Sequence, residues 1–130
     1  GILHEVLAHR PGALLGARTR VTGRLPAGGL HLSPGLSAPG ADLSGQDLRG
    51  CDLRGSAFPG ASFTDAILDS SSLQDCDLQR ACFHGASLSS VDLSGADLRG
   101  ARLSEAYLHV RHDEMTQWPE GFSPPGAGRI

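Results

Sequence analysis

The chain has 130 residues, a length that suits one domain, and its formal net charge is −3. Arg supplies all eleven basic residues, so overall charge gives no general attraction to nucleic acid or to an acidic membrane surface. Aromatic residues make up 5% of the chain, whereas Gly occurs 18 times and Pro 8 times, which excludes a helical bundle. No apolar run approaches the roughly 20 residues that a membrane-spanning helix needs.

Residues 1–40 contain no repeat and are interpreted as an irregular N-terminal cap. Their start, GILHEVLAHR, lacks the basic-then-apolar order of a signal peptide. It predicts a short helix over 2–9, which Pro11 ends. The Gly- and Pro-rich segment that follows predicts an atypical first coil, because terminal repeats need a different cap. We therefore expect residues 1–40 to lie outside the regular frame.

Residues 41–110 form fourteen consecutive blocks of five, which begin ADLSG QDLRG CDLRG. The first position is small in every block except the one that starts with Gln46, and the second is Asp in six blocks. The fifth position is Gly, Asp or Ser in eleven blocks. The third position is always Leu or Phe: Leu43, Leu48, Leu53, Phe58, Phe63, Leu68, Leu73, Leu78, Phe83, Leu88, Leu93, Leu98, Leu103 and Leu108.

A period of five fits neither a helix nor a straight strand. Five residues advance an α-helix by about 500°, so the Leu and Phe side chains would spread around its axis. In a straight strand, an odd period sends alternate side chains to opposite faces. The fourteen large residues can share one interior only if the chain turns a corner in every block. The first and third positions then face inward, the second faces solvent, and the fifth occupies the corner. The pattern predicts a solenoid.

These A(D)LxG blocks resemble those of the pentapeptide-repeat proteins. The resemblance implies an all-β fold, a right-handed, four-sided parallel β-helix with four blocks per coil, or about 3.5 regular coils. Positions twenty residues apart would stack in four interior columns. The resemblance continues into the tail TQWPEGFSPPGAG, which is similar to the T-x-W-P-x-G-F segment that often follows such repeats, with Ser123 where Asp is common.

Residues 111–130 are expected to form a C-terminal cap and tail. The frame stops after Val110, a poor residue for the corner position. Trp118, Pro119 and Phe122 can cover the last coil with apolar surface, and Pro removes a hydrogen-bond donor from the open edge. An uncovered edge would invite association.

Catalytic and metal-binding patterns are weak. Cys51 and Cys76 take the small inward position and are expected to be buried and inert, whereas Cys82 points outward without a base at a fixed spacing. His109, His112, Asp113 and Glu114 resemble a ligand set but are interpreted as a solvated polar turn. We therefore expect no enzyme activity, no cofactor and no metal site. The odd number of cysteines favours a reducing cytoplasm.

The outer sides remain as the functional surface. One side is expected to carry Asp47, Arg49, Asp69, Tyr107 and His109, and another Asp52, Arg54, Asp75 and Asp92, with no base beyond Arg54. We expect a non-catalytic module for protein–protein interaction or scaffolding, with Asp52, Asp75 and Asp92 as the candidate surface. The partner would be a protein, not nucleic acid or a membrane, and self-association stays open.

Two alternatives remain. Some proteins of the resembled family are acidic mimics of duplex DNA that act on DNA gyrase, a type II topoisomerase. Duplex DNA carries one charge per about 1.7 Å, whereas residues 41–110 hold ten acidic residues and five Arg, a net of −5. The other alternative is a structural domain of a larger protein.

Overall fold

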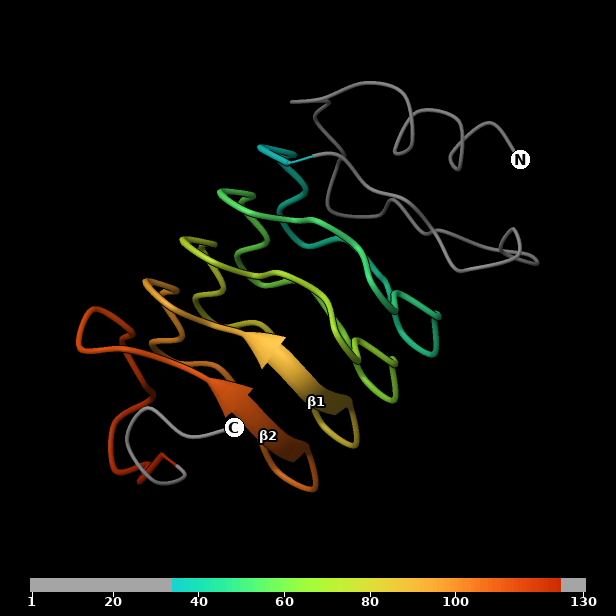
Figure 1. Cartoon of the computed structure of the whole chain (residues 1–130). Helices are drawn as coiled ribbons and strands as arrows, with labels where there is room; N and C mark the ends of the chain where they lie inside the picture. The colour runs from blue at the N-terminus through green and yellow to red at the C-terminus, as the bar shows by residue number, and fades with distance from the viewer. Residues whose placement is uncertain (1–33, 125–130) are drawn as a thin grey trace.

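The computed structural model describes residues 34–124, which wind into a stack of coils with a common axis (Figure 1). Isolated parallel bridges join residues twenty apart along the stack, from Ser37↔Ala57 to Asp97↔Gln117. The two named strands, β1 (Ser87–Asp92) and β2 (Tyr107–Arg111), also pair in parallel. Since twenty residues are four blocks of five, each coil has four sides. The predicted four-sided β-helix is confirmed.

Hydrogen bonds between coils run through the backbone of each side. The amide of a third-position residue donates to the second-position carbonyl of the next coil, as Leu48 N does to Ile67 O at 2.7 Å. The second-position amide donates to the previous coil, as Ile67 N does to Gln46 O at 2.9 Å. Residues 34–124 contain no helix, and hence none that is long and apolar enough to cross a membrane. The all-β class is confirmed.

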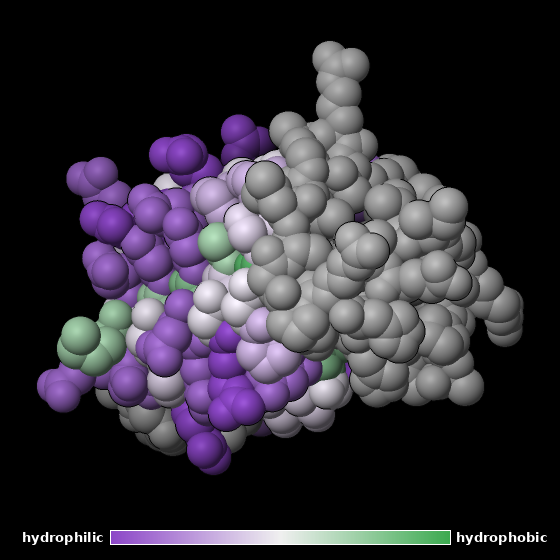
Figure 2. Space-filling view, turned by 90° about the horizontal axis from the view of Figure 1, so that it is seen from above, coloured by the Kyte–Doolittle hydropathy of each residue, from purple (hydrophilic) through white to green (hydrophobic). Residues whose placement is uncertain are grey.

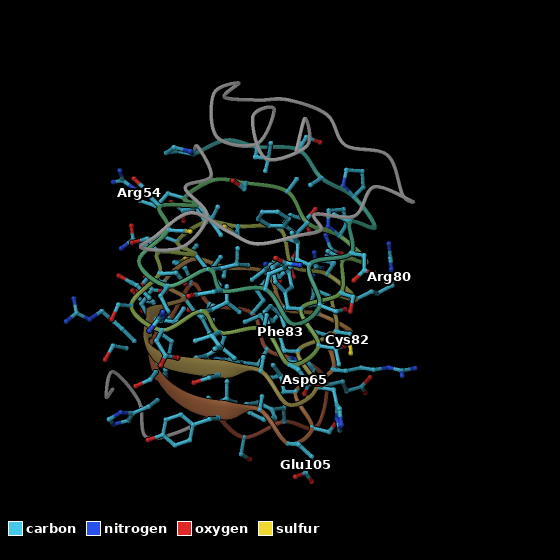
Figure 3. All side chains as sticks on the ribbon, turned by 90° about the vertical axis from the view of Figure 1, so that its right-hand side faces the viewer. Arg54, Asp65, Arg80, Cys82, Phe83 and Glu105 are labelled. Carbon is cyan, nitrogen blue, oxygen red and sulfur yellow. The ribbon has the colours of Figure 1, made fainter. Side chains whose placement is uncertain are left out.

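The third-position side chains fill the interior of the stack. Twelve of the fourteen predicted Leu and Phe residues are no more than 1% exposed. Leu103 and Leu108, in the last coil, are partly buried against the same core. The ring of Phe63 stacks on that of Phe83 with centroids 4.9 Å apart, and it meets Phe58 edge-on at 5.4 Å. Figure 3 shows Phe83 inside the coils and Arg54 and Glu105 pointing outward.

The fifth position forms the corner in a left-handed backbone conformation. Glycine adopts this conformation without steric cost, but six other residues also adopt it, with φ between 57° and 63°: Asp65, Ser70, Asp75, Arg80, Ser90 and Glu105. Asp65 leans over Gly85, so a Cβ on Gly85 would collide with the Asp65 carboxylate. The non-glycine corner is accommodated here because the next coil has a glycine below it.

The paired coils begin at Ser37, before the predicted limit at Ala41. Residues 36–40 form an in-frame block with its corner at Gly40, whose φ is 66°. The inward residues have exchanged sizes, since Leu36 holds the first position and Ala38 the third, and both are buried. One large and one small side chain fill a side in either order, and a search for Leu or Phe at the third position does not recognise this block. The helix predicted over 2–9 lies outside the described residues.

The paired coils also continue past Val110, through a change of register. β1 and β2 pair at Ser89↔His109 and next at Asp92↔Arg111, so β2 has one residue fewer at this corner. Val110 is therefore not a corner residue. It is fully buried and takes the inward first position, as Val91 does in the coil before. The bridge Asp97↔Gln117 restores the spacing of twenty.

His112 consequently takes the inward third position below Leu93, and it is 6% exposed. Its ring meets that of Trp118 edge-on, with centroids 5.3 Å apart. The interpretation of this segment as a solvated polar turn was wrong for His112, because the lost residue in β2 reverses which side chains face inward. Trp118 packs against the core and stacks with Phe122 at 5.3 Å. Pro119 accepts a hydrogen bond from Phe122 N at 3.1 Å.

Asp113 closes the last paired coil with its side chain. In the coil before, Asp75 N donates to the carbonyl of Ser94 at 3.0 Å. One coil later, Gly95 N donates at 3.0 Å to the side-chain carboxylate of Asp113 instead of to a backbone carbonyl. The same carboxylate also accepts hydrogen bonds from the amides of Met115 and Thr116. Desolvation alone would raise the pKa of Asp113, but these amide hydrogen bonds hold the pKa below its ordinary value.

Truncation of the stacked rings tests the assignment of the interior. Phe63→Ala and Phe83→Ala should each lower the free energy of unfolding by about 3–5 kcal/mol, because each leaves a cavity in a fully packed column. Ser44→Ala, on the outer surface of the same side, should cost about 1 kcal/mol or less. Chemical denaturation measures all three. Equal losses would contradict the inward and outward assignment.

Two buried serines in first positions allow a test of how hydrogen bonding of a buried hydroxyl affects stability. The Oγ of Ser56 accepts a hydrogen bond from Leu36 N at 3.1 Å, whereas among the described residues the buried Oγ of Ser71 has no partner. Ser56→Ala should cost about 1–3 kcal/mol, because it leaves a buried amide unpaired. Ser71→Ala should leave stability unchanged or raise it. A larger loss at Ser71 than at Ser56, measured by urea denaturation, would refute this account.

Asp113→Asn should lower the thermal unfolding midpoint at neutral pH, because the amide cannot supply a charged acceptor to three backbone amides. The pKa of Asp113 is lowered on folding. Its stabilising effect is therefore complete above the ordinary carboxyl pKa and disappears as the pH falls through the lower folded pKa. The difference between the two proteins should shrink accordingly. Glu114→Gln, at the exposed neighbour, is the control and should leave the midpoint at neutral pH unchanged.

Candidate interaction faces

Each of the four sides presents two outward columns, one from second positions and one from fourth positions. We name each side by the first Leu or Phe in the third position of its interior column. The second-position bridges assign the columns: Asp42↔Ser62↔Cys82↔Arg102 on the Leu43 side, Asp47↔Ile67↔Ser87↔Tyr107 on the Leu48 side, Asp52↔Ser72↔Asp92↔Arg111 on the Leu53 side, and Ser37↔Ala57↔Asp77↔Asp97↔Gln117 on the Phe58 side.

The second-position aspartates have a structural role that the sequence analysis missed. Each accepts a hydrogen bond from the amide two residues later, as Asp42 does from Ser44 N at 3.1 Å and Asp92 does from Ser94 N at 2.9 Å. The same bond forms at Asp47, Asp52, Asp77 and Asp97. This Asx-type turn bends the chain toward the corner. Asp at the second position therefore stabilises the turn, in addition to being compatible with exposure to solvent.

Arginine at the fourth position neutralises three of these carboxylates. Arg49, Arg54 and Arg99 each bind the Asp two residues earlier through two parallel bonds, with Nη2–Oδ2 distances of 2.7 Å. The Arg hydrogen bonds lower the pKa values of Asp47, Asp52 and Asp97. These pairs are at the surface, so each adds little stability. Their effect is to break the acidic surface into neutral pairs.

The predicted acidic set on the Leu53 side does not form a continuous patch. Asp52 is paired with Arg54, and Asp75 occupies a corner with φ of 58°. Burial alone would raise the pKa of Asp92, but hydrogen bonds from Ser94 and Gln74, aided by the charge of Arg111, hold it below its ordinary value. The expectation of no base beyond Arg54 was wrong, because the register change brings Arg111 onto this side.

The Leu43 side carries a ladder of hydroxyl groups. The Oγ atoms of Ser44 and Ser62 lie 2.8 Å apart, Ser62 donates to Thr64, and Thr64 Oγ1 donates to Cys82 Sγ at 3.4 Å. Cys82 is half-buried on this outer side, and Figure 3 places its sulfur at the margin of the coils.

The other two cysteines, Cys51 and Cys76, are buried. Cys76 Sγ donates to the carbonyl of Leu53 at 2.9 Å, and burial raises the pKa of Cys76 to about 12. It is therefore a thiol at neutral pH, without the thiolate that nucleophilic chemistry needs.

The structure separates the two histidines of the ligand-like segment. His109 lies outward and exposed, with its ring 6.3 Å from that of Tyr107, whereas His112 lies in the interior. Residues 34–124 contain no group of three or more His, Cys, Asp or Glu side chains that could hold a metal ion.

The Leu48 side is where large apolar side chains reach the surface. Among the described residues, Ile67, Tyr107 and Met115 are the exposed large hydrophobic residues, and Ile67 and Tyr107 share this side with exposures of 39% and 59%. The face of the molecule seen in Figure 2 is mostly hydrophilic over the described residues. We call the six residues Ile67, Asp69, Ser87, Ser89, Tyr107 and His109 the Tyr107 face.

The chain itself carries a signal for this face. Second positions are otherwise small or polar, and the two large apolar exceptions are Ile67 and Tyr107. They stand forty residues apart, which is two coils, so they must share a side. The sequence analysis placed Tyr107 and His109 on this side but did not use Ile67.

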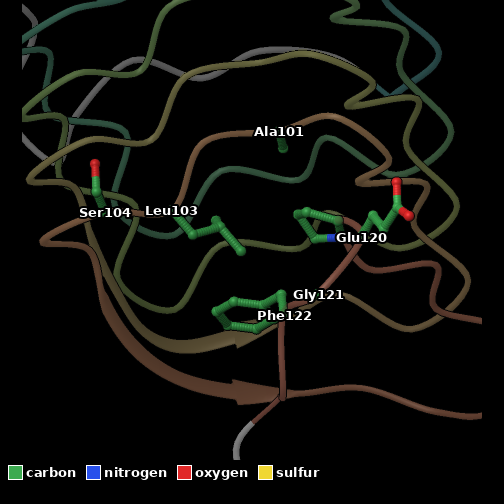
Figure 4. Close-up of a pocket in the computed structure, with 7 residues that line it drawn as sticks. Ala101, Leu103, Ser104, Glu120, Gly121 and Phe122 are labelled. Carbon is green, nitrogen blue, oxygen red and sulfur yellow. The ribbon is translucent and has the colours of Figure 1, made fainter.

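An open depression of about 340 Å³ lies where the tail meets the last coil. Leu103 and Phe122 line it, and Glu120 lies beside them (Figure 4). The predicted cap residues Pro119 and Phe122 therefore lie at the end of the Leu43 column, around the same depression as Leu103. The depression is a feature of the cap, and its polar side chains are the Glu120 carboxylate and the Ser104 hydroxyl, whose Oγ lies 2.8 Å from His84 Nδ1.

Comparison with known proteins gives the family. The family model for pentapeptide repeats matches eight copies over residues 40–75 and 71–109. Rfr23, a pentapeptide-repeat protein from the cyanobacterium Cyanothece 51142, superposes with a TM-score of 0.50 at 23% identity, over 83% of this chain and 86% of its own. A pentapeptide-repeat protein of the Arabidopsis thaliana thylakoid lumen is 31% identical over 58% of this chain and 62% of its own, with a TM-score of 0.47.

A trypsin-treated variant of QnrB1, a plasmid-mediated fluoroquinolone resistance protein, is 26% identical with a TM-score of 0.54. The match covers 79% of this chain and 52% of that protein, so this chain matches about half the length of QnrB1. No curated protein matches the sequence. The β-helix is right-handed, as in these relatives. The family match covers more than half of the chain, and the chain therefore belongs to the pentapeptide-repeat family, whose proteins are generally structural and non-catalytic.

Proposed function

We propose that this chain is a non-catalytic protein-interaction module and that it binds its partner through the Tyr107 face. The observation that carries the proposal is the placement of Ile67 and Tyr107, both exposed, on one side of a stack whose other large apolar residues are mostly buried. Apolar surface gathered on one side and bordered by polar groups is typical of an interaction site.

The chemistry of the face suits protein recognition. Tyr combines a large apolar ring with a hydroxyl and loses little conformational entropy on binding, so it is enriched among residues that dominate interface energy. Ser87 lies between Ile67 and Tyr107 in the bridged column. Its small side chain leaves room there for an apolar group of a partner.

The backbone beneath the face is held rigidly. Ser87 in β1 is paired with Tyr107 in β2, and Leu68 and Leu88, which point into the interior on this side, are fully buried. A surface that is already ordered loses little entropy on association. The fold therefore supports recognition by a fixed surface rather than by a mobile loop.

A second candidate function is mimicry of duplex DNA toward DNA gyrase. The similarity to QnrB1, a fluoroquinolone resistance protein, favours it. The Asp–Arg pairs oppose it, because Asp47, Asp52 and Asp97 have their charges neutralised by neighbours. A mimic needs roughly one uncompensated charge per 1.7 Å. We therefore rank it below protein recognition through the Tyr107 face.

Capture experiments on immobilised protein test the leading proposal. Tyr107→Ala should lower retention of the partner from an extract of the native cells by about tenfold or more, since aromatic anchors dominate interfaces. Met115→Ala removes an apolar side chain that is 67% exposed but outside the face, and it should change retention less than twofold. Retention should survive about 0.5 M salt, where charge–charge contacts are screened within a few ångströms. Equal retention by both variants would refute the assignment.

A gyrase supercoiling assay across a salt series decides the alternative. Salt-sensitive inhibition or protection that disappears when Asp52, Asp75 and Asp92 are changed to Asn, and that is unaffected by Tyr107→Ala, would replace our proposal with the DNA mimic. No effect on gyrase at any salt concentration would exclude it.

A further inference from the structure

We infer that the partner bound by the Tyr107 face is a second copy of this chain, related by a two-fold axis that runs along β1 at the level of Ser87 and Ser89. This inference rests on the proposed function and names the occupant of the same face. It follows from the order of side chains in the two outward columns of the Leu48 side.

The geometry of such an axis fixes which residues meet. Rotation about a line that lies in the plane of the face and along the strand reverses the order of the coils. It leaves the position along the strand unchanged. Second-position residues therefore face second-position residues, and the coil before Ser87 faces the coil after it. Because the bridges run Ile67↔Ser87↔Tyr107, Ile67 of one copy faces Tyr107 of the other.

The fourth-position column has matching chemistry under the same rotation. Asp69, Ser89 and His109 follow one another at intervals of one coil, so Asp69 of one copy faces His109 of the other. A carboxylate then lies opposite an imidazole, and each of these contacts occurs twice. Ser87 and Ser89 lie at the axis, where each residue meets its own copy. Small polar side chains allow close approach at that place.

The other face-to-face arrangement lacks this match. An axis parallel to the stack keeps the coil order and exchanges the two columns, so Ile67 would face Asp69 and an apolar group would cover a carboxylate. Burying a carboxylate against an apolar group, with no opposite charge across the interface, is costly. The antiparallel arrangement is therefore the one in which both columns are self-complementary.

The carboxylate of Asp69 is held on the face before any partner binds. Its Oδ1 accepts hydrogen bonds from Ser87 Oγ at 2.6 Å and from Ser89 N at 3.3 Å. His109 is exposed beside Tyr107 on β2. The Asp69 carboxylate is therefore already fixed in place on the face.

The small size of the face predicts a weak, reversible dimer. The coils lie about 4.8 Å apart, so the three coils of the face span roughly 10 Å between the outer two. The patch of about 800 Å² per partner that is typical of stable complexes is roughly 28 Å across, so this face is much smaller. We therefore expect association that depends on concentration and becomes measurable from roughly 10 µM to 1 mM.

Sedimentation velocity of the full chain over this concentration range tests the inference. Tyr107→Ala should raise the dimer dissociation constant about tenfold or more. His109→Asp should raise it about two- to fivefold by facing Asp69 with a like charge, and His109→Lys should lower it by a similar factor. Met115→Ala should leave it unchanged. Circular dichroism confirms that each variant is folded.

Coupling between Asp69 of one copy and His109 of the other supplies the decisive comparison. Asp69→Asn retains an oxygen that can accept from Ser87 and Ser89 but removes the charge. In this background His109→Lys should no longer strengthen the dimer. A gain of the same size with and without the Asp69 charge would overturn the proposed pairing.

Two further outcomes would overturn the inference and separate it from the proposed function. A protein that stays monomeric at 1 mM, or a dimer that none of these substitutions changes, excludes this use of the face by a second copy. If Tyr107→Ala still abolishes capture of a different protein, the proposed function survives with another partner. If Tyr107→Ala affects neither capture nor self-association, both are wrong.

Discussion

The structure depends on two constraints: the chain completes one coil every twenty residues, and each side of the coil points one large and one small side chain inward. Residues twenty positions apart then lie directly above one another in successive coils, at the spacing of paired strands. The Leu and Phe side chains of the four columns fill the interior, and the rings of Phe63 and Phe83 stack within it. Only the outer columns and the ends of the stack are therefore available for contact with another molecule.

The outer columns also contribute to forming the coil. Asp in the second position closes a turn with the amide two residues later, as Asp97 does with Arg99 N at 3.1 Å. Where Arg follows, the same carboxylate is neutralised. A surface that looks acidic in composition is thus partly an array of local turns and ion pairs. The departures from this local pattern, above all Ile67 and Tyr107, are what distinguish one side from the others.

Because the stack is regular, the contacts between two copies of one side can be predicted directly. Side chains on one side are ordered by coil number, so a two-fold rotation simply reverses their order. On the Leu48 side this reversal matches apolar with apolar and acid with imidazole. A two-fold axis at the same coil on the Leu53 side would set Ser72 against Arg111 and Asp92 against its own copy, without an apolar pair. The difference arises from particular residues and not from the fold, which is common to all four sides.

The period of five alone determined the solenoid and its interior, because inward and outward directions within a block depend on local backbone alternation. It also placed Tyr107 and His109 on one side once four blocks were assigned to each coil. Only the tertiary structure decided where the frame bends. Whether Leu36 and Ala38 form a block depends on Ser56 and Ala57 in the next coil, which accept its backbone hydrogen bonds and bridge to it. Likewise, Val110 and His112 face inward and Arg111 faces outward because β2 is paired with β1 one residue short. A local pattern cannot record that choice, since it is made by hydrogen bonds to residues about twenty positions away.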